Sequence, residues 1–387
     1  MAMRNKRRRS AWQGGNRFEL LPGSRCYLPA MQSAVDGARV SIMLELYLME
    51  SGRLTQRVID ALSRAASRGV IVRLMLDGFG AMYLNQQDRQ RLRDAGVILR
   101  FFNPLAWRGL SKNLTRDHRK LLVVDERMAF TGGFGATDEF LEAWFEIALR
   151  IEGPVVEDWV GLFLRLWNSS LTRGDADSCP AHYRSAHPAR QEVVKASPEV
   201  QGGMRGRVVW GQGYRYQAIR FSLHQQVSRA RHRIWVCTPY FVPTLSLRRR
   251  LARAARRGVD VRLLLPGESH DHPGIRYAGQ RFYGRLLRAG VRIFEYQPAF
   301  IHAKFSLADE WISVGSCNFD HWSLQWNLEA NQEVQDEAFA DQIATLFERC
   351  FLRSQEILPQ QWARRPWWQR LREGIFGTLD AWATRLR

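Results

Sequence analysis

The chain has 387 residues, 45% of them hydrophobic, so it can bury a large core and has room for two or three domains. No run approaches the roughly 18 consecutive apolar residues that cross a bilayer, so no transmembrane helix is expected. The formal charge of +19 favours polyanionic partners such as nucleic acid, an anionic membrane surface or a phosphorylated substrate, unless it reflects only a preference for arginine.

The N-terminus and the cysteines exclude two further classes. Residues 1–14 start with a basic cluster but lack the apolar stretch of a secretory signal. The cysteines are scattered and show no Cys-x-x-Cys spacing, so neither a disulfide framework nor a zinc site is expected. A reducing cytosol is the expected compartment. The cysteines are Cys26, Cys179, Cys237, Cys317 and Cys350.

The first predicted elements along the chain are helix–strand units that occur twice. Residues 61–78 predict a helix, a glycine break and a β-branched strand, and residues 251–267 repeat that order. A second helix–glycine–strand unit spans 91–102 and returns at 285–296. Strands that alternate with helices in this way predict layered α/β structure in each half.

Two strands joined by a short turn follow these units in each half, at 117–133 and 301–316. The duplication predicts two α-β-α lobes related by a pseudo-twofold axis, with an active site at their interface. The expected parts are a basic tail at 1–14, a first lobe at 15–167, a connector at 168–203, a second lobe at 204–358, and an amphipathic helix rich in Trp and Arg at 359–387.

Each half carries the pattern His-x-Lys-x4-Asp, followed by a glycine and, fourteen residues after that glycine, by a glutamate. Chance would place roughly 0.005 copies of His-x-Lys-x4-Asp in a chain of this composition, so two copies at equivalent places in a repeat are significant. The members are His118, Lys120, Asp125, Gly132 and Glu146 in the first half and His302, Lys304, Asp309, Gly315 and Glu329 in the second.

The motifs predict chemistry on a phosphodiester. Residues i and i+2 of a strand point to one face, so the histidine and lysine of each motif project together. One imidazole acts as the nucleophile and the other protonates the leaving alkoxide. The ammonium groups of Lys120 and Lys304 stabilise the charge on the phosphate oxygens. Glu146 and Glu329 accept the N–H of each ring and fix its tautomer.

Other polar residues near the motifs receive smaller roles. Ser316 and Asn318 can add hydrogen bonds to the phosphate. Asp125 and Asp309 come at the ends of their strands, and we interpret them as structural.

Three residues of the second half leave alternatives open. His270 and His272 could form a metal pair by composition, but a solvated loop is the preferred interpretation. Tyr240 either lines the site or packs in its wall.

At these residues the chain resembles the phospholipase D superfamily, and its second half is similar to bacterial cardiolipin synthases without N-terminal transmembrane helices. Residues 15–31, 239–267 and 302–334 carry the resemblance, which extends over most of the chain from 15 to 355. It implies two α-β-α lobes, a covalent phosphohistidine, no metal ion or other cofactor, and phosphatidyl transfer between phosphatidylglycerol molecules with release of glycerol.

The resemblance also implies that His118 is the nucleophile and His302 the general acid, an order that the symmetry of the motifs leaves open. Two features depart from the family pattern. Gly135 stands where the first motif should carry asparagine, and only five residues rather than six separate Asp309 from Gly315. Both leave the histidines and lysines intact, and both allow reduced or altered activity.

The C-terminal segment predicts an interfacial helix. Between 364 and 387 apolar residues recur every three or four positions, and arginines flank them. Trp and Arg on one amphipathic helix are typical of membrane anchoring, and the alternative is a helix docked on its own domain. The residues expected to contact a membrane are Trp107, Trp367, Trp368, Ile375 and Trp382.

The leading hypothesis is a phosphatidyltransferase that makes cardiolipin. Its expected partners are phosphatidylglycerol and an anionic membrane surface, where it would act peripherally at the cytoplasmic face of the cell membrane. A hydrolytic phospholipase D differs only in whether water or an alcohol resolves the phosphohistidine. The basic charge also allows a nuclease, although nucleic acid is not an expected partner. A non-catalytic binder of anionic lipid or nucleic acid is a further alternative. No obligate protein partner is inferred.

Overall fold

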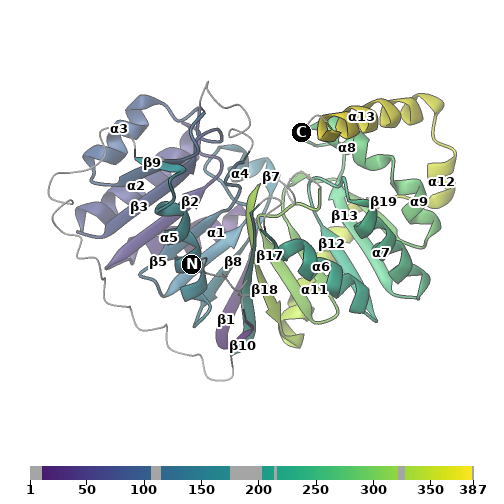
Figure 1. The fold of residues 1–387 in the computed structure, drawn as a ribbon, viewed down its shortest axis with the longest axis horizontal. Helices are drawn as coiled ribbons and strands as arrows, with labels where there is room; N and C mark the ends of the chain where they lie inside the picture. Colours follow the sequence, from purple (N-terminus) through teal and green to yellow (C-terminus); the bar gives the residue numbers. More distant parts are fainter. Residues whose placement is uncertain (1–10, 106–114, 175–202, 213–215, 321–326, 386–387) are drawn as a thin grey trace, which may run out of the picture.

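The computed structural model describes residues 11–105, 115–174, 203–212, 216–320 and 327–385. It confirms the expected fold class, with two α-β-α lobes side by side (Figure 1). The first lobe contains β1 (Gln13–Pro22), α1 (Ser24–Asp36), β2 (Ser41–Leu46), α2 (Arg53–Ser67), β3 (Ile71–Asp77), α3 (Gln86–Asp94), β4 (Ile98–Phe102), β5 (Leu121–Val124), β6 (Met128–Gly132), α4 (Glu139–Glu142), β7 (Trp144–Phe145), β8 (Ile147–Glu152), α5 (Val156–Trp167) and β9 (Thr172–Gly174).

The second lobe repeats this order and ends in two helices. Its elements are β10 (Met204–Gln212), β11 (Tyr216–Gln217), α6 (Ala218–Arg229), β12 (Arg233–Cys237), α7 (Leu245–Arg256), β13 (Asp260–Pro266), α8 (Pro273–Gln280), α9 (Tyr283–Arg288), β14 (Arg292–Tyr296), β15 (Phe300–Ile301), β16 (Phe305–Ala308), β17 (Trp311–Gly315), β18 (Leu328–Gln335), α11 (Glu337–Phe351), β19 (Ser354–Glu356), α12 (Pro359–Ala363) and α13 (Trp367–Arg385).

The two sheets have equivalent strand orders. The first runs β1–β8–β6–β5–β2–β3–β4–β9, and the second runs β10–β18–β17–β16–β12–β13–β14–β19. In each, three neighbouring strands are parallel and the others are antiparallel. The repeated order is the structural form of the duplication in the sequence.

Apolar strands and well-capped helices explain these layers. β2 and β5 are buried along their whole length, because helices cover both faces of each sheet. The Asp138 carboxylate accepts the Leu54 N–H at 2.8 Å and caps the start of α2. Thr244 caps α7 in the same way through the Leu247 N–H at 3.3 Å. Each cap satisfies a donor that the first turn of a helix leaves without a partner.

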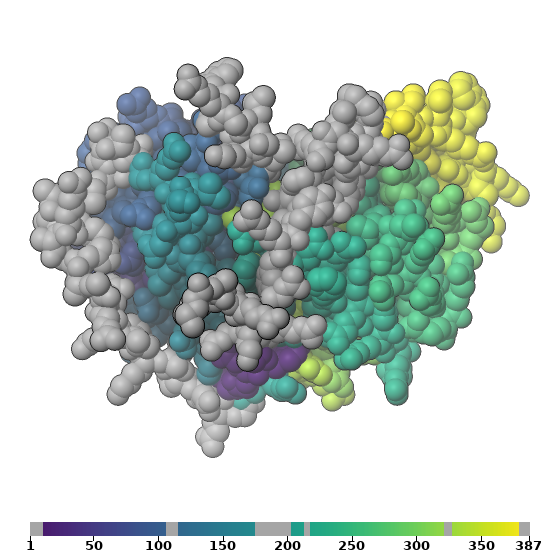
Figure 2. Space-filling view, in the orientation of Figure 1, coloured from purple at the N-terminus to yellow at the C-terminus, as the bar shows by residue number. Residues whose placement is uncertain are grey.

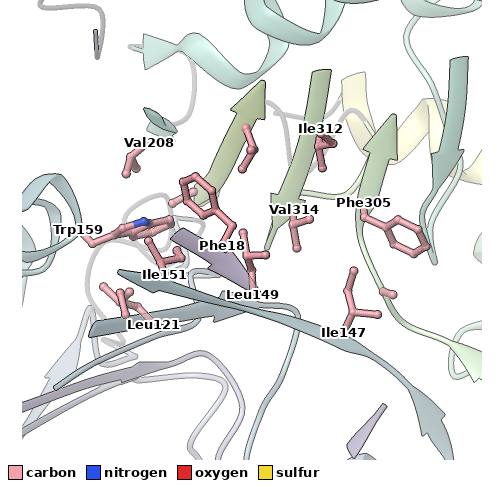
Figure 3. Close-up of a cluster of buried hydrophobic side chains, with 14 of the residues drawn as sticks. Phe18, Leu121, Ile147, Leu149, Ile151, Trp159, Val208, Phe305, Ile312 and Val314 are labelled. Carbon is pink, nitrogen blue, oxygen red and sulfur yellow. The ribbon is translucent and has the colours of Figure 1, made fainter. Parts of the chain in front are cut away.

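The two lobes are joined by strand pairing and by a common hydrophobic core. β1 pairs with β8 and, near its start, also with β10, where Gln13 lies opposite Gly206. Trp159 of α5 donates its indole N–H to the Gln332 side chain at 2.9 Å. Figure 3 shows apolar side chains of both lobes in one cluster, with Phe18 and Leu149 near Val314. The interface between the lobes is therefore a hydrophobic core.

Two boundaries differ from the expected ones. β9 pairs with β4, so the first lobe extends past residue 167 into the segment 168–203 that the sequence assigned to a connector. The single C-terminal helix expected at 359–387 is two helices, α12 and α13, because the segment 364–366 between them contains Pro366. Within the described part of the chain, no helix combines the length and the hydropathy needed to cross a membrane.

Candidate active site

The two motif histidines lie just ahead of equivalent strands, β5 and β16, rather than inside them as the sequence suggested. Their backbones instead bond to the opposite lobe. The His118 N–H donates to the Leu328 carbonyl at 2.9 Å, and the His302 N–H donates to the Phe145 carbonyl at 2.9 Å. The residues after these acceptors are the motif glutamates, Glu329 and Glu146, so each backbone contact brings one motif beside the acid of the other lobe.

The His–Glu pairs cross between the lobes. Nδ1 of His118 lies 2.9 Å from Oε1 of Glu329, and Nδ1 of His302 lies 2.8 Å from Oε2 of Glu146. The sequence predicted that the glutamates contact the rings, but it did not indicate which glutamate contacts which ring. A carboxylate on Nδ1 leaves Nε2 as the ring nitrogen that can meet a substrate.

Both motif lysines are buried against their own histidines. Nζ of Lys120 donates to the His118 carbonyl at 2.6 Å. Nζ of Lys304 donates to the His302 carbonyl, lies 2.9 Å from each ring nitrogen of His302, and lies 3.8 Å from Oε2 of Glu146. Each lysine is only 1% exposed. The ammonium groups are thus held beside the imidazoles and away from bulk water.

Burial depresses the pKa of all four groups, and repulsion by the lysines adds to this effect at both histidines and at Lys120. Burial, Lys120 and Lys304 hold the pKa of His118 well below its usual value, and burial with Lys304 lowers the pKa of His302 to about 3. Burial also lowers the pKa of Lys120 to about 7 and that of Lys304 to about 8. Because the lysine of one motif depresses the histidine of the other, the two motifs share one electrostatic site.

The two glutamates differ in their protonation. Burial raises the pKa of Glu329 to about 8, against the lowering effect of Lys120. Burial also acts to raise the pKa of Glu146, but Lys304 and the hydrogen bond from His302 outweigh it, and the net shift is downward. Glu329, which pairs with His118, therefore holds its proton more tightly than Glu146, which pairs with His302.

Among the described residues, aromatic rings contact both imidazoles, one at His118 and three at His302. The Tyr47 ring meets the His118 ring edge-on at 4.9 Å. The His302 ring lies 4.8 Å from Trp144, 5.6 Å from Phe140 and 5.9 Å from Phe300. These rings limit the access of water, which strengthens the electrostatic interactions of the site.

Ser316 and the motif aspartates bind protein groups. The Ser316 hydroxyl donates to the Glu329 carboxylate and accepts the Ala330 N–H at 3.1 Å, so it positions the acid. Asn318 is 2% exposed and follows β17 in the same loop. The Asp125 carboxylate accepts the N–H groups of the three residues that lead into β2, and Asp309 does the same ahead of β12. The donors are Arg39, Val40 and Ser41 for Asp125 and Arg231, His232 and Arg233 for Asp309.

Both departures from the family pattern have structural consequences. A Cβ atom at Gly135 would lie 2.7 Å from Cε2 of Phe140, the ring that faces His302. Phe140 in its present place therefore requires glycine at 135. The shorter spacing of the second motif gives a two-residue turn between β16 and β17, compared with three residues between β5 and β6.

The interpretation of His270 as part of a solvated loop is wrong. Its side chain is 1% exposed, and Nδ1 lies 3.1 Å from Oδ1 of Asp271, while His272 is 65% exposed. Asp271 also accepts the Tyr240 hydroxyl, and the His270 ring lies 5.0 Å from Phe300 in the wall around His302. Among the described residues no cluster of three potential metal ligands occurs.

The sequence did not predict that Tyr240, His270 and Asp271 lie together beside the site. Burial alone would raise the pKa of Asp271, but hydrogen bonds from His270 and Tyr240 lower it to about 2. The carboxylate adds a fixed negative charge that raises the pKa of Lys304. The sequence shows a run of five polar residues at 268–272, but their composition alone does not indicate that they lie beside the motif histidines.

A buried ionic network near His118 was also missed. Nε of Arg119 lies 2.6 Å from Oε1 of Glu45 and 3.1 Å from Oδ1 of Asp117. The equivalent positions in the second lobe are Cys237 for Glu45 and Ala303 for Arg119. The sequence does contain a sign of this network, because the first motif reads Asp-His-Arg-Lys and the second, without the two charged neighbours, reads Ile-His-Ala-Lys. The two lobes are therefore chemically unequal.

The residues expected at a membrane lie partly on α13. Trp367, Trp368 and Ile375 are 74%, 48% and 50% exposed. The opposite side of the helix packs on α8, where the Phe376 ring lies 5.4 Å from that of Tyr277. The helix is thus docked on its own lobe at the edge of the molecule (Figure 2), and the exposed Trp367, Trp368 and Ile375 give it an apolar outer face. Trp107 and the side chain of Trp382 are outside the described residues.

Comparison with known proteins identifies the family. Residues 31–167 and 223–351 match the family described as "Cardiolipin synthase, PLD-like domain". Cardiolipin synthase B of Escherichia coli K12 is 32% identical over 374 residues, which cover 92% of this chain and 86% of that protein. The major cardiolipin synthase ClsA of Bacillus subtilis 168 is 28% identical over 376 residues, which cover 94% of this chain and 75% of that protein.

A solved structure shows the same fold. Phosphatidylserine synthase of Haemophilus influenzae superposes with a TM-score of 0.74 at 12% identity, covering 96% of this chain and 93% of that one. With the match to the family over both lobes, the chain belongs to the cardiolipin synthase family of phospholipase D-like enzymes, which are phosphatidyltransferases.

Proposed function

We propose that the protein transfers a phosphatidyl group from phosphatidylglycerol to a second phospholipid through a phosphohistidine, with release of glycerol. The observation that carries this proposal is the crossed pairing of His118 with Glu329 and of His302 with Glu146 in one buried site. Two imidazoles with fixed tautomers and two lysines are the groups that a two-step displacement at phosphorus needs.

In the first step, His118 is the nucleophile. Glu329 holds the Nδ1 side of the ring, so the lone pair of Nε2 attacks phosphorus while the bond from phosphorus to the glycerol oxygen breaks. The depressed pKa of His118 keeps that lone pair free. His302 donates the proton that the leaving glycerol oxygen takes up, and the negative phosphodiester raises the pKa of His302 when it binds.

In the second step, a hydroxyl of the acceptor lipid gives its proton to His302 and attacks phosphorus. The bond from phosphorus to Nε2 of His118 breaks, and both imidazoles regain their starting protonation. Lys120 and Lys304 neutralise the equatorial oxygens in both steps. The aromatic wall of Trp144 and Phe300 favours an alcohol over water as acceptor, because it limits water at the intermediate.

We also propose that the protein reaches its lipid substrate by lying on the cytoplasmic face of the cell membrane. The exposed Trp367, Trp368 and Ile375 of α13 would enter the interface, and the net positive charge would favour anionic lipid. A docked helix with an outward apolar face suits a surface contact, since it needs no refolding on binding.

One experiment tests the reaction. Purified protein is incubated with phosphatidylglycerol vesicles, and the lipids are analysed by mass spectrometry beside His118→Ala and His302→Ala. Cardiolipin with an equal amount of glycerol supports the proposal. Phosphatidic acid as the main product would instead establish the hydrolase, and the absence of both products would overturn an enzymatic role on this lipid.

A further inference from the structure

An apolar cavity of about 290 Å³ lies in the first lobe, between helices α1 and α2 and the face of the sheet that they cover. It is separate from the histidines and lysines of the motifs. Its lining residues are Tyr27, Leu28, Pro29, Met31, Gln32, Val35, Leu44, Leu46, Leu54, Arg57, Val58, Ala61, Leu62, Leu122, Phe134, Gly135 and Ala136.

The size and lining of this cavity suit a hydrocarbon chain. The cavity is partly open at its rim and its walls are largely apolar, so it leaves apolar surface accessible that a small ligand could cover. An engineered apolar cavity of about 150 Å³ stays dry and binds benzene, and the present one is larger. At roughly 30 Å³ for each small group, as for a water molecule in the liquid, there is room for about ten methylene groups.

The rim carries one positive charge. Arg57 lines the cavity and is exposed, and no carboxylate of the described residues lies within ion-pair distance of it. The neighbouring acid, Asp36, is already held by Arg64 at 3.0 Å and by Gln32 at 2.8 Å. An anionic head group at the rim would therefore meet a guanidinium that has no acidic partner among those residues.

The inner end of the cavity adjoins the motif loop. Phe134, Gly135 and Ala136 line it, and a Cβ atom added at Gly135 would meet the Phe140 ring that faces His302. Phe140 thus separates a ligand in the cavity from the imidazole. Because the reacting phosphate would lie on the far side of this ring, the cavity is available to a molecule other than the reacting lipid.

We propose that this cavity binds a single-chain anionic amphiphile, a fatty acid of about ten carbons, with its chain among the apolar residues of α1 and α2 and its carboxylate at Arg57. The carboxylate and the chain are recognised by separate parts of the site, one polar and exposed, the other apolar and buried. This site does not depend on the transfer reaction, since none of its lining residues is a motif histidine, lysine or glutamate.

Isothermal titration calorimetry with decanoate, below its micelle concentration and in the absence of other lipid, tests this proposal on the full chain. We expect one saturable site per chain. Val58→Trp and Met31→Trp fill the cavity from α2 and from α1, at half-buried positions, and each should weaken binding at least tenfold. Arg57→Glu should weaken it about tenfold, and decanol should bind more weakly than decanoate.

The controls keep the same helices and the same chemical changes. Ser67→Trp on α2 and Arg25→Glu on α1 are exposed and do not line the cavity, so both should bind as the wild type does. His118→Ala should also bind normally, which separates this site from the reaction. Absence of saturable binding, or binding unchanged in both tryptophan variants that fold by circular dichroism, would overturn the site. Equal affinity for decanol and decanoate would overturn the anionic head group.

Discussion

Oε1 of Glu329 lies 2.9 Å from Nδ1 of His118, although 211 residues separate them in the chain. The same relationship links Glu146 and His302 at 2.8 Å over 156 residues. Each lobe thus supplies the carboxylate that orients the imidazole of the other lobe. The backbone contact between His118 and Leu328 fixes this arrangement, because it places the residue before Glu329 beside the motif.

Glu329→Gln should reduce kcat by roughly 10²–10⁴-fold with little change in KM, because an amide neither holds the required tautomer nor stabilises the imidazolium. Steady-state transfer on phosphatidylglycerol vesicles measures this effect. Glu348→Gln, an exposed carboxylate on α11, is the matched control and should keep full activity. A Glu329→Gln enzyme as active as the control would show that this acid does not act through His118.

The pH dependence of kcat/KM should show an alkaline limb far below that of an ordinary lysine. The pKa of Lys120 is lowered to about 7 and that of Lys304 to about 8, so their ammonium groups are lost as the pH rises through this range. We expect kcat/KM to fall by roughly tenfold per pH unit between pH 7 and 8, where Lys120 loses its proton, and by roughly a hundredfold per unit above pH 8, where both required protons are being lost. Circular dichroism over the same range checks that the fold persists. A flat profile up to pH 10 would contradict the depressed values.

Lys120→Met should abolish transfer but stabilise the fold at pH 7. The folded-state pKa is depressed from 10.5 to about 7, so the unfolded chain binds the proton more tightly, and the stability from this group is present only above pH 10.5 and lost as the pH falls towards 7. Removing the amine should raise the free energy of unfolding at pH 7 by about 2 kcal/mol. This is less than the whole pKa shift would give at about 1.4 kcal/mol per pKa unit.

Urea denaturation at pH 7 measures the effect of Lys120→Met. Arg349→Met, an exposed cation on α11, should change the free energy of unfolding by no more than about 0.5 kcal/mol. A destabilised Lys120→Met variant would mean that the hydrogen bond to the His118 carbonyl outweighs the cost of burying the charge.

Gly135→Ala should lower transfer activity by roughly tenfold, since the new Cβ atom would displace the Phe140 ring and, with it, the wall of His302. Gly135→Ala combined with Phe140→Leu should recover part of the loss, because the smaller side chain makes room. Gly161→Ala on α5, where a Cβ atom meets nothing within 4 Å, is the control. The steric explanation would be contradicted if Phe140→Leu alone is active but the double variant has no more transfer activity than Gly135→Ala.

The double variant Trp367→Ser with Trp368→Ser should weaken sedimentation with anionic liposomes by about tenfold or more, because two exposed indoles no longer enter the interface. Leu352→Ser removes an apolar side chain that is 87% exposed elsewhere on the second lobe, and it should leave binding unchanged. Equal liposome binding by the double variant and the wild type would remove α13 from the membrane contact.

Local patterns in the sequence predicted the fold class and placed the motif residues. The duplication and the spacing of His118, Lys120 and Glu146 are properties of neighbouring residues, so they can be read from one chain. The crossed partners could not be, because whether Glu146 meets His118 or His302 depends on how the lobes pack. The same holds for His270, whose burial comes from Phe300 and Tyr240 rather than from its polar neighbours.

The continuity from β1 to β10 has a consequence for how lipid arrives. Rotating one lobe against the other would break the pairing of Gln13 with Gly206, the Trp159–Gln332 hydrogen bond and the core in Figure 3. We therefore expect turnover without hinge motion between the lobes, with one radius of gyration in small-angle scattering for the free and the lipid-loaded protein. Any gate for the substrate must lie in side chains and loops at the rim of the site.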